Sequence, residues 1–371
     1  MKIAVVGHIR HPIAEPFMGG MESHCHQLVT ALAQRGHEVV LFAAAGCDLP
    51  QARAICAQPY EHVLPWSEWC GTDRLAAYQH AAFEFAWHEI VGGEFDIVHN
   101  NSLFTPLMDW AAADGHPMVT SQHVPPFGAM RDTVSGHAHC DWQHFTVTSH
   151  HQLSLWDDCN SAPFSVVHNG IDTRQWPTVP VRGERLVWFG RITETKGLRE
   201  AVQAARLAGA ALDIVGTIED EAYFNEAVRP WLGDRIRYLG HMSGPQLRRQ
   251  IAGAVAAIVT PLWDEPFGLV AAEAMSCGVP VIAFDRGAMR EVLGPCGLLV
   301  PPGDVPALAA AMGRAAGLDG SACRQRIEQK FSVDRMLDGY ETCYRAAIAG
   351  VKPAFSSSRP SSNSSTVAEL A

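Results

Sequence analysis

The sequence predicts an α/β fold built from two doubly wound, Rossmann-like domains. Short runs of β-branched and other apolar residues alternate with amphipathic stretches along most of the 371 residues. Unbroken apolar runs of this length are typical of parallel strands that helices bury on both faces. The alternation restarts after a segment rich in turn-forming residues, which indicates a second domain of the same kind.

The predicted strands form two series, one on either side of residue 170. A helix is predicted at Met21–Arg35, directly after the first strand, because apolar residues recur there at helical spacing. The strands of the first series are 3–6, 38–44, 96–100, 117–122 and 145–149, and those of the second are 185–190, 212–216, 236–240, 256–261, 279–284 and 297–301.

The boundary between the domains is predicted near residues 168–180, where turn formers and prolines gather. This gives an N-terminal domain at 1–168 and a C-terminal domain at 172–332. A last helix, predicted at about 333–350, is able to pack back on the first domain. Residues 353–371 are rich in Ser and Pro, so we expect a disordered tail. A ligand is expected between the domains, at the carboxyl ends of the strands.

The charge distribution argues against a nucleic-acid partner. Residues 1–170 hold 6 Lys and Arg against 17 Asp and Glu, whereas residues 171–371 hold 22 of each. The whole formal net charge of −11 therefore lies in the first half. A nucleic-acid-binding protein needs a basic face, and contact with an anionic membrane is not indicated either.

Cysteine usage and the N-terminal residues predict a cytoplasmic protein. The ten cysteines include no CxxC pair, so buried free thiols in a reduced compartment are the simplest interpretation. The five residues between Lys2 and His8 are too few for the core of a signal peptide and are typical of a first strand. No stretch approaches the roughly 18 apolar residues of a membrane span. The oligomeric state is left open.

The strongest motif begins at Glu265 and ends at Glu273, eight residues later, directly after a predicted strand. The chain from Gly268 to Gly278 is predicted to be helical. The free amides at the start of such a helix favour an anion such as a diphosphate. Glu273 would then face the same ligand and accept two ribose hydroxyls. The alternative is a buried helix whose N-terminal acid complements the dipole.

A pair of cations follows the strand at 185–190. Arg191 and Lys196 lie five residues apart in a loop that also holds Gly190 and Gly197. Two cations at the carboxyl end of a strand can neutralise the charge on a departing nucleoside diphosphate. The alternative is a pair of solvated charges on a loop.

Two weaker motifs belong to the N-terminal half. Gly19 and Gly20 precede the first predicted helix and allow the backbone to approach a phosphate or a sugar closely. His123 follows the strand at 117–122 and could face the cleft. A plain loop and a structural histidine are the alternatives.

Together, these motifs and the HNGID sequence at 168–172 resemble the large glycosyltransferase family 4. The resemblance runs in the expected order from residue 1 to about residue 348, and the motif from Glu265 to Glu273 is its most specific part. Members of this family are retaining enzymes with the GT-B fold. The resemblance implies a nucleotide-sugar donor on the C-terminal domain, an acceptor on the N-terminal domain, and no metal or other cofactor.

The resemblance also implies a role for each candidate residue. Glu273 would hold the ribose, Glu265 the transferred hexose and His123 a hydroxyl of that sugar. Val124 stands where family members often carry an acid, so acceptor handling beside His123 stays open. The other implied donor-binding residues are Arg191 and Lys196 at the diphosphate, the amides of Gly268, Leu269 and Val270 with the neighbouring Phe267, the loop of Gly19 and Gly20, and His241 and Met242 at the base.

The implied activity is transfer of a hexose-type sugar from a UDP- or GDP-sugar to a glycan, a lipid-linked precursor or a small molecule. In a retaining reaction of this kind, the acceptor attacks the face that the diphosphate leaves, and the departing phosphate takes its proton. A nucleotide-sugar epimerase, a phosphorylase and a non-catalytic sugar-nucleotide-binding protein remain alternatives. The phosphorylase is disfavoured because it usually needs a lysine for pyridoxal phosphate, and Lys196 already has a role.

Histidines are concentrated in the first half, where 17 of the 18 occur. Five histidines and Cys140 fall within residues 137–151, which raises a zinc-dependent hydrolase as a further alternative. No HExxH or CxxC motif supports it, so we expect no metal and leave the role of this segment open. The loop at 124–144 is predicted to lie on the acceptor side, where Trp66, Trp69 or Trp142 would either stack on sugars or pack in the core.

Overall fold

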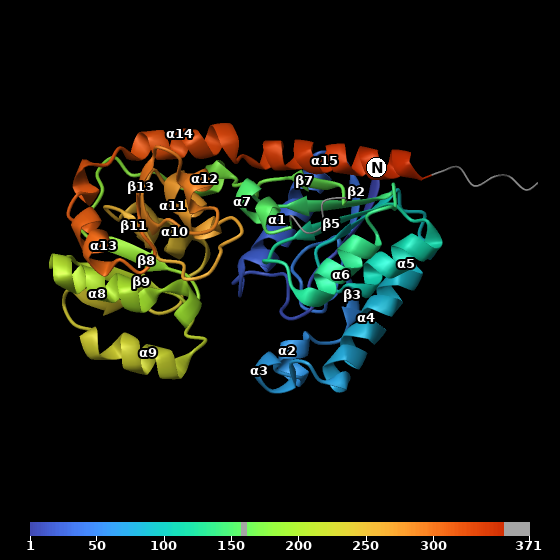
Figure 1. The fold of residues 1–371 in the computed structure, drawn as a ribbon, viewed down its shortest axis with the longest axis horizontal. Helices are drawn as coiled ribbons and strands as arrows, with labels where there is room; N and C mark the ends of the chain where they lie inside the picture. Colours follow the sequence, from blue (N-terminus) through green and yellow to red (C-terminus); the bar gives the residue numbers. More distant parts are fainter. Residues whose placement is uncertain (157–161, 352–371) are drawn as a thin grey trace, which may run out of the picture.

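The computed structural model describes residues 1–156 and 162–351, which form two α/β domains (Figure 1). The N-terminal domain holds a seven-stranded sheet of order β3-β2-β1-β4-β5-β6-β7. The C-terminal domain holds a six-stranded sheet of order β10-β9-β8-β11-β12-β13. Neighbouring strands are parallel in both sheets, as in the pairing of Ile3 with Val39. The predicted fold class is therefore confirmed, and the predicted tail at 353–371 lies outside the described residues.

The N-terminal sheet contains the five predicted strands and two further ones at its edges. The edge strands β3 and β7 are short and partly exposed, so they lack the unbroken apolar run that marks a buried strand. The elements are β1 Lys2–Val6, α1 Gly20–Gln34, β2 Glu38–Ala44, β3 Ala52–Cys56, α2 Tyr60–Val63, α3 Trp66–Trp69, α4 Asp73–Gly92, β4 Ile97–Asn100, α5 Pro106–Asp114, β5 Met118–Gln122, α6 Gly128–Gly136, β6 Gln143–Val147, α7 His150–Ser154 and β7 Phe164–Val166.

The C-terminal sheet contains all six strands predicted for it, and its four inner strands, β9, β8, β11 and β12, are buried throughout. Its order reverses direction between β8 and β11, which is the position where open α/β sheets bind ligands. The elements are β8 Leu186–Phe189, α8 Leu198–Ala208, β9 Leu212–Val215, α9 Glu221–Ala227, β10 Ile236–Tyr238, α10 Gly244–Ala252, β11 Ala257–Val259, α11 Leu269–Ser276, β12 Val281–Phe284, α12 Met289–Leu293, β13 Gly297–Val300, α13 Val305–Met312 and α14 Gly320–Lys330.

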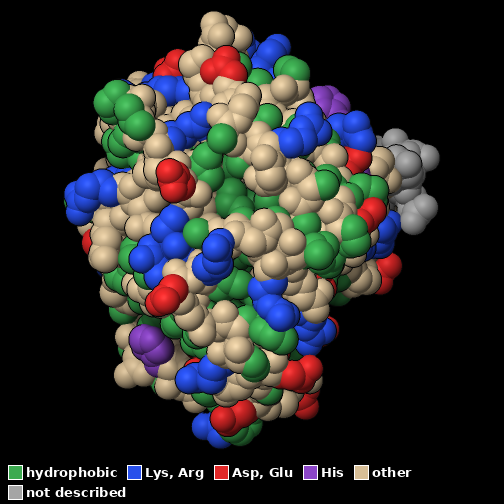
Figure 2. Space-filling model, turned by 90° about the vertical axis from the view of Figure 1, so that its left-hand side faces the viewer, with side chains coloured by type: hydrophobic (Ala, Val, Ile, Leu, Met, Phe, Trp, Pro, Cys, Tyr) green, Lys and Arg blue, Asp and Glu red, His purple; other side chains and the backbone are tan. Residues whose placement is uncertain are grey.

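The outer face of the C-terminal domain carries charges of both signs. Figure 2 shows Lys and Arg side chains spread over this face with Asp and Glu between them. This mixture agrees with the equal numbers of acidic and basic residues in the second half of the sequence. Among the described residues, no helix combines the length and the apolar composition needed to cross a lipid bilayer.

The last helix, α15 (Val333–Gly350), belongs in space to the N-terminal domain. It leaves α14 and runs over β4, β5 and β6 and beside α1 (Figure 1). Ser332 caps its N-terminus by accepting a hydrogen bond from the amide of Arg335. Its apolar face joins the core formed by β1, α1 and β5, and Tyr340 and Tyr344 are completely buried in that core.

A polar contact fixes α15 inside this core. The hydroxyl of Tyr344 lies 2.6 Å from Nδ1 of His99 on β4. The other ring nitrogen of His99 lies 2.7 Å from the hydroxyl of Ser121 on β5. Burial lowers the pKa of His99 to about 3, so the ring is neutral and both nitrogens need partners.

Replacing Tyr344 by Phe should destabilise the protein by about 1–3 kcal/mol, because a buried ring nitrogen of His99 would lose its partner. Chemical denaturation of the variant and the wild type measures this difference. Tyr78→Phe is the matched control, since its hydroxyl bonds to the carbonyl of Gln58 at an exposed position. If both variants lost the same amount of unfolding free energy, the buried contact with His99 would contribute no more to stability than the exposed hydrogen bond of Tyr78.

Candidate active site

A cleft of about 1000 Å³ separates the two sheets at the carboxyl ends of their strands. Loops and helix N-termini of both domains line it. Every candidate residue from the sequence analysis lies on its wall, namely Gly19, Gly20, His123, Arg191, Lys196, His241, Met242, Glu265, Phe267, Gly268, Leu269, Val270 and Glu273.

The N-terminus of α11 opens directly into this cleft. Gly268 precedes the helix with a φ of 91°, a left-handed conformation that favours glycine. A Cβ atom at this position would also collide with the terminal methyl group of Met289. The turn leaves the amides of Leu269 and Val270 at the helix start, where no intrahelical acceptor exists. Together with the helix dipole, they form a site for an anion.

Lys196 and Glu265 meet at the base of the cleft. The ammonium of Lys196 lies 2.7 Å from Oε2 of Glu265, and the indole of Trp263 donates to the same oxygen at 2.7 Å. Lys196 also lies 5.0 Å from the centre of the Trp263 ring. Close packing holds the loop, because a Cβ at Gly197 would collide with the carbonyl of Thr260. The cation and the carboxylate are therefore fixed next to the anion site.

Arg191 follows β8 and faces the cleft with 42% of its side chain exposed. In this structure its guanidinium pairs with Glu219, at an N–O distance of 3.0 Å. Glu219 lies in the loop after β9 and is itself accessible. An incoming diphosphate could therefore compete with Glu219 for the guanidinium fork.

Glu273 lies one turn inside α11 and lines the cleft. Among the described residues, no hydrogen bond to its carboxyl group is formed. Burial raises its pKa to about 8, and the guanidinium of Arg248 only partly opposes this shift. Arg248 in turn reaches across the cleft to Glu15, at 3.6 Å. A carboxyl group without a hydrogen bond, placed beside an anion site, is suited to accept ligand hydroxyls.

His123 faces the cleft from the N-terminal domain. Its Nε2 donates to the side-chain oxygen of Asn101 at 2.7 Å, which leaves Nδ1 as an acceptor. Burial lowers its pKa to about 4, so the ring is neutral near pH 7. The ring of His24 lies 4.5 Å away and is buried as well. His123 therefore offers a neutral, oriented hydrogen-bonding group.

The N-terminus of α1 faces that of α11 across the cleft. A Cβ atom at Gly20 would lie 2.9 Å from Cδ1 of Leu269, so the absence of a side chain allows the two domains to approach. Gly19 has an extended backbone with a φ of −159°, which any residue can adopt. The close approach of the two domains therefore explains why residue 20 is a glycine, but it does not explain the glycine at position 19.

The far end of the cleft is formed by loops after β9 and β10. Nδ1 of His241 forms a hydrogen bond with the hydroxyl of Thr217, at 3.1 Å, and Met242 packs against the apolar core of the C-terminal domain. Three further residues line the cleft that the sequence motifs did not predict, namely Thr217, Glu219 and Arg248. Thr217 and Glu219 follow a strand and could have been found by that position, whereas Arg248 lies inside α10 and has no local signal.

The histidine-rich segment does not gather into one cluster. His137 pairs with Asp109 at 2.6 Å, and Cys140 lies 4.0 Å from the other nitrogen of His137. Of the tryptophans considered for sugar stacking, Trp66 lines the cleft and is 41% exposed. Trp69 packs against the apolar core, and the indole of Trp142 donates to the carbonyl of Ala111.

Comparison with known proteins independently supports the family resemblance found in the sequence motifs. Residues 18–175 match the model described as Glycosyltransferase Family 4, and residues 183–317 match that of glycosyl transferases group 1. The chain is 27% identical to a glycogen synthase of Mycobacterium tuberculosis, over 94% of this chain and 96% of that protein. It is also 27% identical to a phosphatidyl-myo-inositol mannosyltransferase of Mycobacterium leprae, over 79% and 83%.

The fold matches solved structures over nearly the whole chain. Anabaena HepE, solved in complex with UDP-glucose, superposes with a TM-score of 0.67 at 19% identity, covering 92% of this chain and 99% of that one. Two family models that between them span both domains, relatives that align with most of the chain and the shared two-domain architecture lead to one conclusion. This chain belongs to the family 4 glycosyltransferases of the GT-B fold.

Proposed function

We propose that this protein is a retaining, metal-independent hexosyltransferase that uses a UDP- or GDP-sugar as donor. The observation that carries this proposal is the convergence of four features in one cleft. These are the free amides of α11, the cations Arg191 and Lys196, the free carboxyl group of Glu273, and the neutral imidazole of His123 on the opposite wall.

The proposed donor lies along the C-terminal wall of the cleft. Its diphosphate accepts hydrogen bonds from the amides of Leu269 and Val270 and pairs with Arg191 and Lys196. Glu273 accepts the ribose hydroxyls. The loop that carries His241 and Met242 frames the base, largely through its backbone. The hexose extends toward the N-terminal domain, where Glu265 and His123 bind its hydroxyls.

Catalysis in this proposal depends on stabilising the leaving group. The acceptor oxygen attacks the anomeric carbon on the face from which the diphosphate departs, while the bond between that carbon and the phosphate oxygen breaks. The departing phosphate oxygen takes the proton of the acceptor. Arg191, Lys196 and the α11 amides neutralise the negative charge that develops, which a metal ion does in other transferases.

The acceptor would enter from the N-terminal side of the cleft. Arg10 lies there, but its guanidinium is already paired with Glu61 at 2.8 Å. Trp66 offers an exposed aromatic face beside Arg10, at 5.7 Å from its guanidinium carbon. These groups favour a sugar or another hydroxyl-bearing acceptor over a strongly anionic one.

The nine described cysteines are all free, which supports a cytoplasmic location.

A thermal-shift panel of UDP, GDP and ADP with their common sugar conjugates, all in EDTA, tests the donor site. One diphosphate should raise the melting temperature selectively, because a ligand that binds only the folded state stabilises it. A panel without any response would overturn the proposal. Donor consumption that yields an isomerised nucleotide sugar, instead of free diphosphate, would identify the epimerase alternative.

Nucleotide binding should strengthen as the pH rises from 7 toward 9, because ionised Glu273 accepts two ribose hydroxyls and its pKa in the free protein is about 8. Glu273→Gln should weaken the affinity by about 1.5–3 kcal/mol and flatten this dependence. Calorimetry of UDP and GDP across this pH range measures both effects. Wild-type affinity in the variant would remove Glu273 from the ribose site.

The same variant should stabilise the ligand-free protein at high pH. The carboxyl group holds its proton more tightly in the folded than in the unfolded protein, so its stabilising contribution is present below about pH 4.5 and is lost as the pH rises through about 8. Glu273→Gln avoids this loss. We expect the free energy of unfolding of Glu273→Gln to exceed that of the wild type by about 1–2 kcal/mol at pH 9 and to equal it at pH 4. The value at pH 9 already allows for the screening of Glu273 by solvent in the cleft.

Lys196→Ala should lower turnover by a factor on the order of 10²–10³, since one charge-stabilising group at the leaving diphosphate would be lost. Release of nucleoside diphosphate from the donor measures turnover, and circular dichroism checks the fold. Lys330→Ala is the matched control, because Lys330 is exposed at the end of α14. Full activity of the Lys196 variant would exclude this residue from the mechanism.

A further inference from the structure

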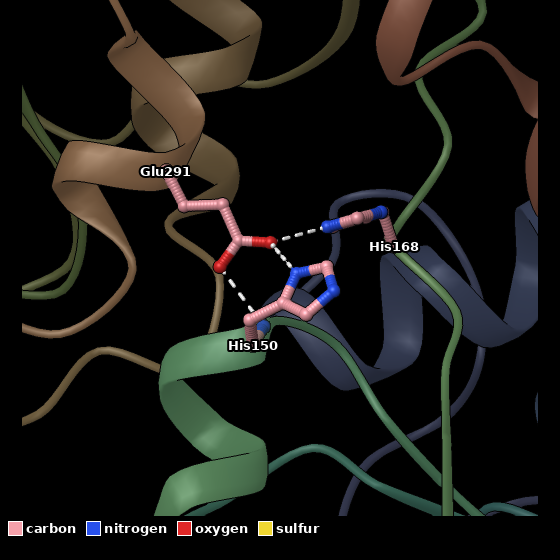
Figure 3. A group of neighbouring side chains, drawn as sticks. All are labelled: His150, His168 and Glu291. Carbon is pink, nitrogen blue, oxygen red and sulfur yellow. Dashed lines mark hydrogen bonds and ion pairs between the residues drawn. The ribbon is translucent and has the colours of Figure 1, made fainter.

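Three side chains converge behind the cleft, at the junction between the two domains (Figure 3). His150 is the first residue of α7 in the N-terminal domain, His168 lies in the linker after β7, and Glu291 lies on α12 of the C-terminal domain. Figure 3 shows both imidazole rings pointing at the carboxylate of Glu291. None of the three lines the cleft, so this cluster is separate from the proposed donor site.

The geometry of the cluster brings one oxygen and two nitrogens together. Oε1 of Glu291 lies 2.7 Å from Nδ1 of His150 and 2.6 Å from Nε2 of His168. The three atoms lie within 4.8 Å of one another. It is the one group of His, Cys, Asp and Glu side chains with this spacing in residues 1–156 and 162–351.

We propose that His150, His168 and Glu291 form a binding site for a divalent metal ion of the zinc type. Two imidazoles and one carboxylate are a donor set that zinc prefers, whereas calcium and magnesium take oxygen ligands almost exclusively. With the protein supplying three ligands, water would take a fourth, tetrahedral position. The metal would replace the protons that now join each imidazole to the carboxylate.

The surroundings of the cluster already orient its ligands. Oε2 of Glu291 accepts a hydrogen bond from the amide of His150 at 2.9 Å, which leaves Oε1 for the ion. The ring of His168 packs edge-on against Phe331, at 5.2 Å between ring centres. Such contacts around a ligand set its orientation and strengthen metal binding. His150 is 71% exposed, so an ion can enter from solvent.

A metal at this position would join the two domains directly behind the loop that carries Glu265 and Pro266. On one side, the hydroxyl of Ser149 donates to the carbonyl of Pro266 at 2.6 Å. On the other, the amide of Ala288, just before α12, donates to the carbonyl of Glu265 at 2.9 Å. Coordination would fix α7, the linker and α12 together. The ion would thus control how freely the domains move, and it would take no part in sugar transfer.

Calorimetric titration of the full chain with Zn²⁺ tests the site. We expect one tight site per chain in the wild type, and an affinity lower by at least about a hundredfold in His150→Ala and in Glu291→Gln. His150 is mostly exposed, so its truncation leaves the core intact. Zinc should also raise the melting temperature of the wild type but not that of His150→Ala.

Matched controls come from the histidine-rich segment itself. His137 and Cys140 lie close to each other in this segment but do not belong to the proposed site. The variants His137→Ala and Cys140→Ser should therefore leave the zinc affinity unchanged. The absorption spectrum of the Co²⁺-loaded protein should show nitrogen and oxygen ligands without thiolate charge transfer. The proposal is wrong if the wild type binds no stoichiometric zinc, if His150→Ala and Glu291→Gln bind it as the wild type does, or if binding is lost in the two controls.

Discussion

The left-handed backbone at Gly268 is the constraint on which the arrangement of the cleft depends. It turns the chain from the loop after β11 into α11, so that the first amides of this helix face the cleft. Glu265 lies before the turn and Glu273 lies after it, and both carboxylates reach the same space. A side chain at this position would collide with Met289 and would also be strained by its positive φ. One residue without a Cβ thereby sets the positions of the anion site and of two acids.

The cations that line the cleft are paired with carboxylates of the chain. Lys196 lies against Glu265, Arg191 against Glu219, and Arg248 against Glu15, although the last pair is longer, at 3.6 Å. Glu273 differs, because no described donor contacts it and its pKa is raised. In the proposed function, binding of the donor would exchange these internal ion pairs for pairs with phosphate and would supply hydroxyls to Glu273. This exchange would need little reorganisation, since the groups already face the cleft.

Local sequence patterns predicted the two sheets and the walls of the cleft, because residues that follow buried parallel strands gather at one edge. The edge strands β3 and β7 escaped prediction since their partial exposure breaks the apolar run. Arg248 escaped because nothing within α10 marks it as facing another domain. The cluster of His150, His168 and Glu291 could not be predicted either, because its two histidines lie 141 and 123 residues before Glu291 in the sequence. Such contacts arise only from the placement of one domain on the other.

The return of α15 to the N-terminal domain has a consequence for biosynthesis. The core around β1, β4 and β5 includes Tyr340, Tyr344 and Ala347, which are among the last described residues to be synthesised. On the ribosome, the first domain must wait with an open apolar face until the second domain has been made. The buried ring of His99 likewise has no partner for its Nδ1 until Tyr344 emerges. The two domains are consequently separate in architecture but joined in folding, and a break in the chain between them would leave the first one incomplete.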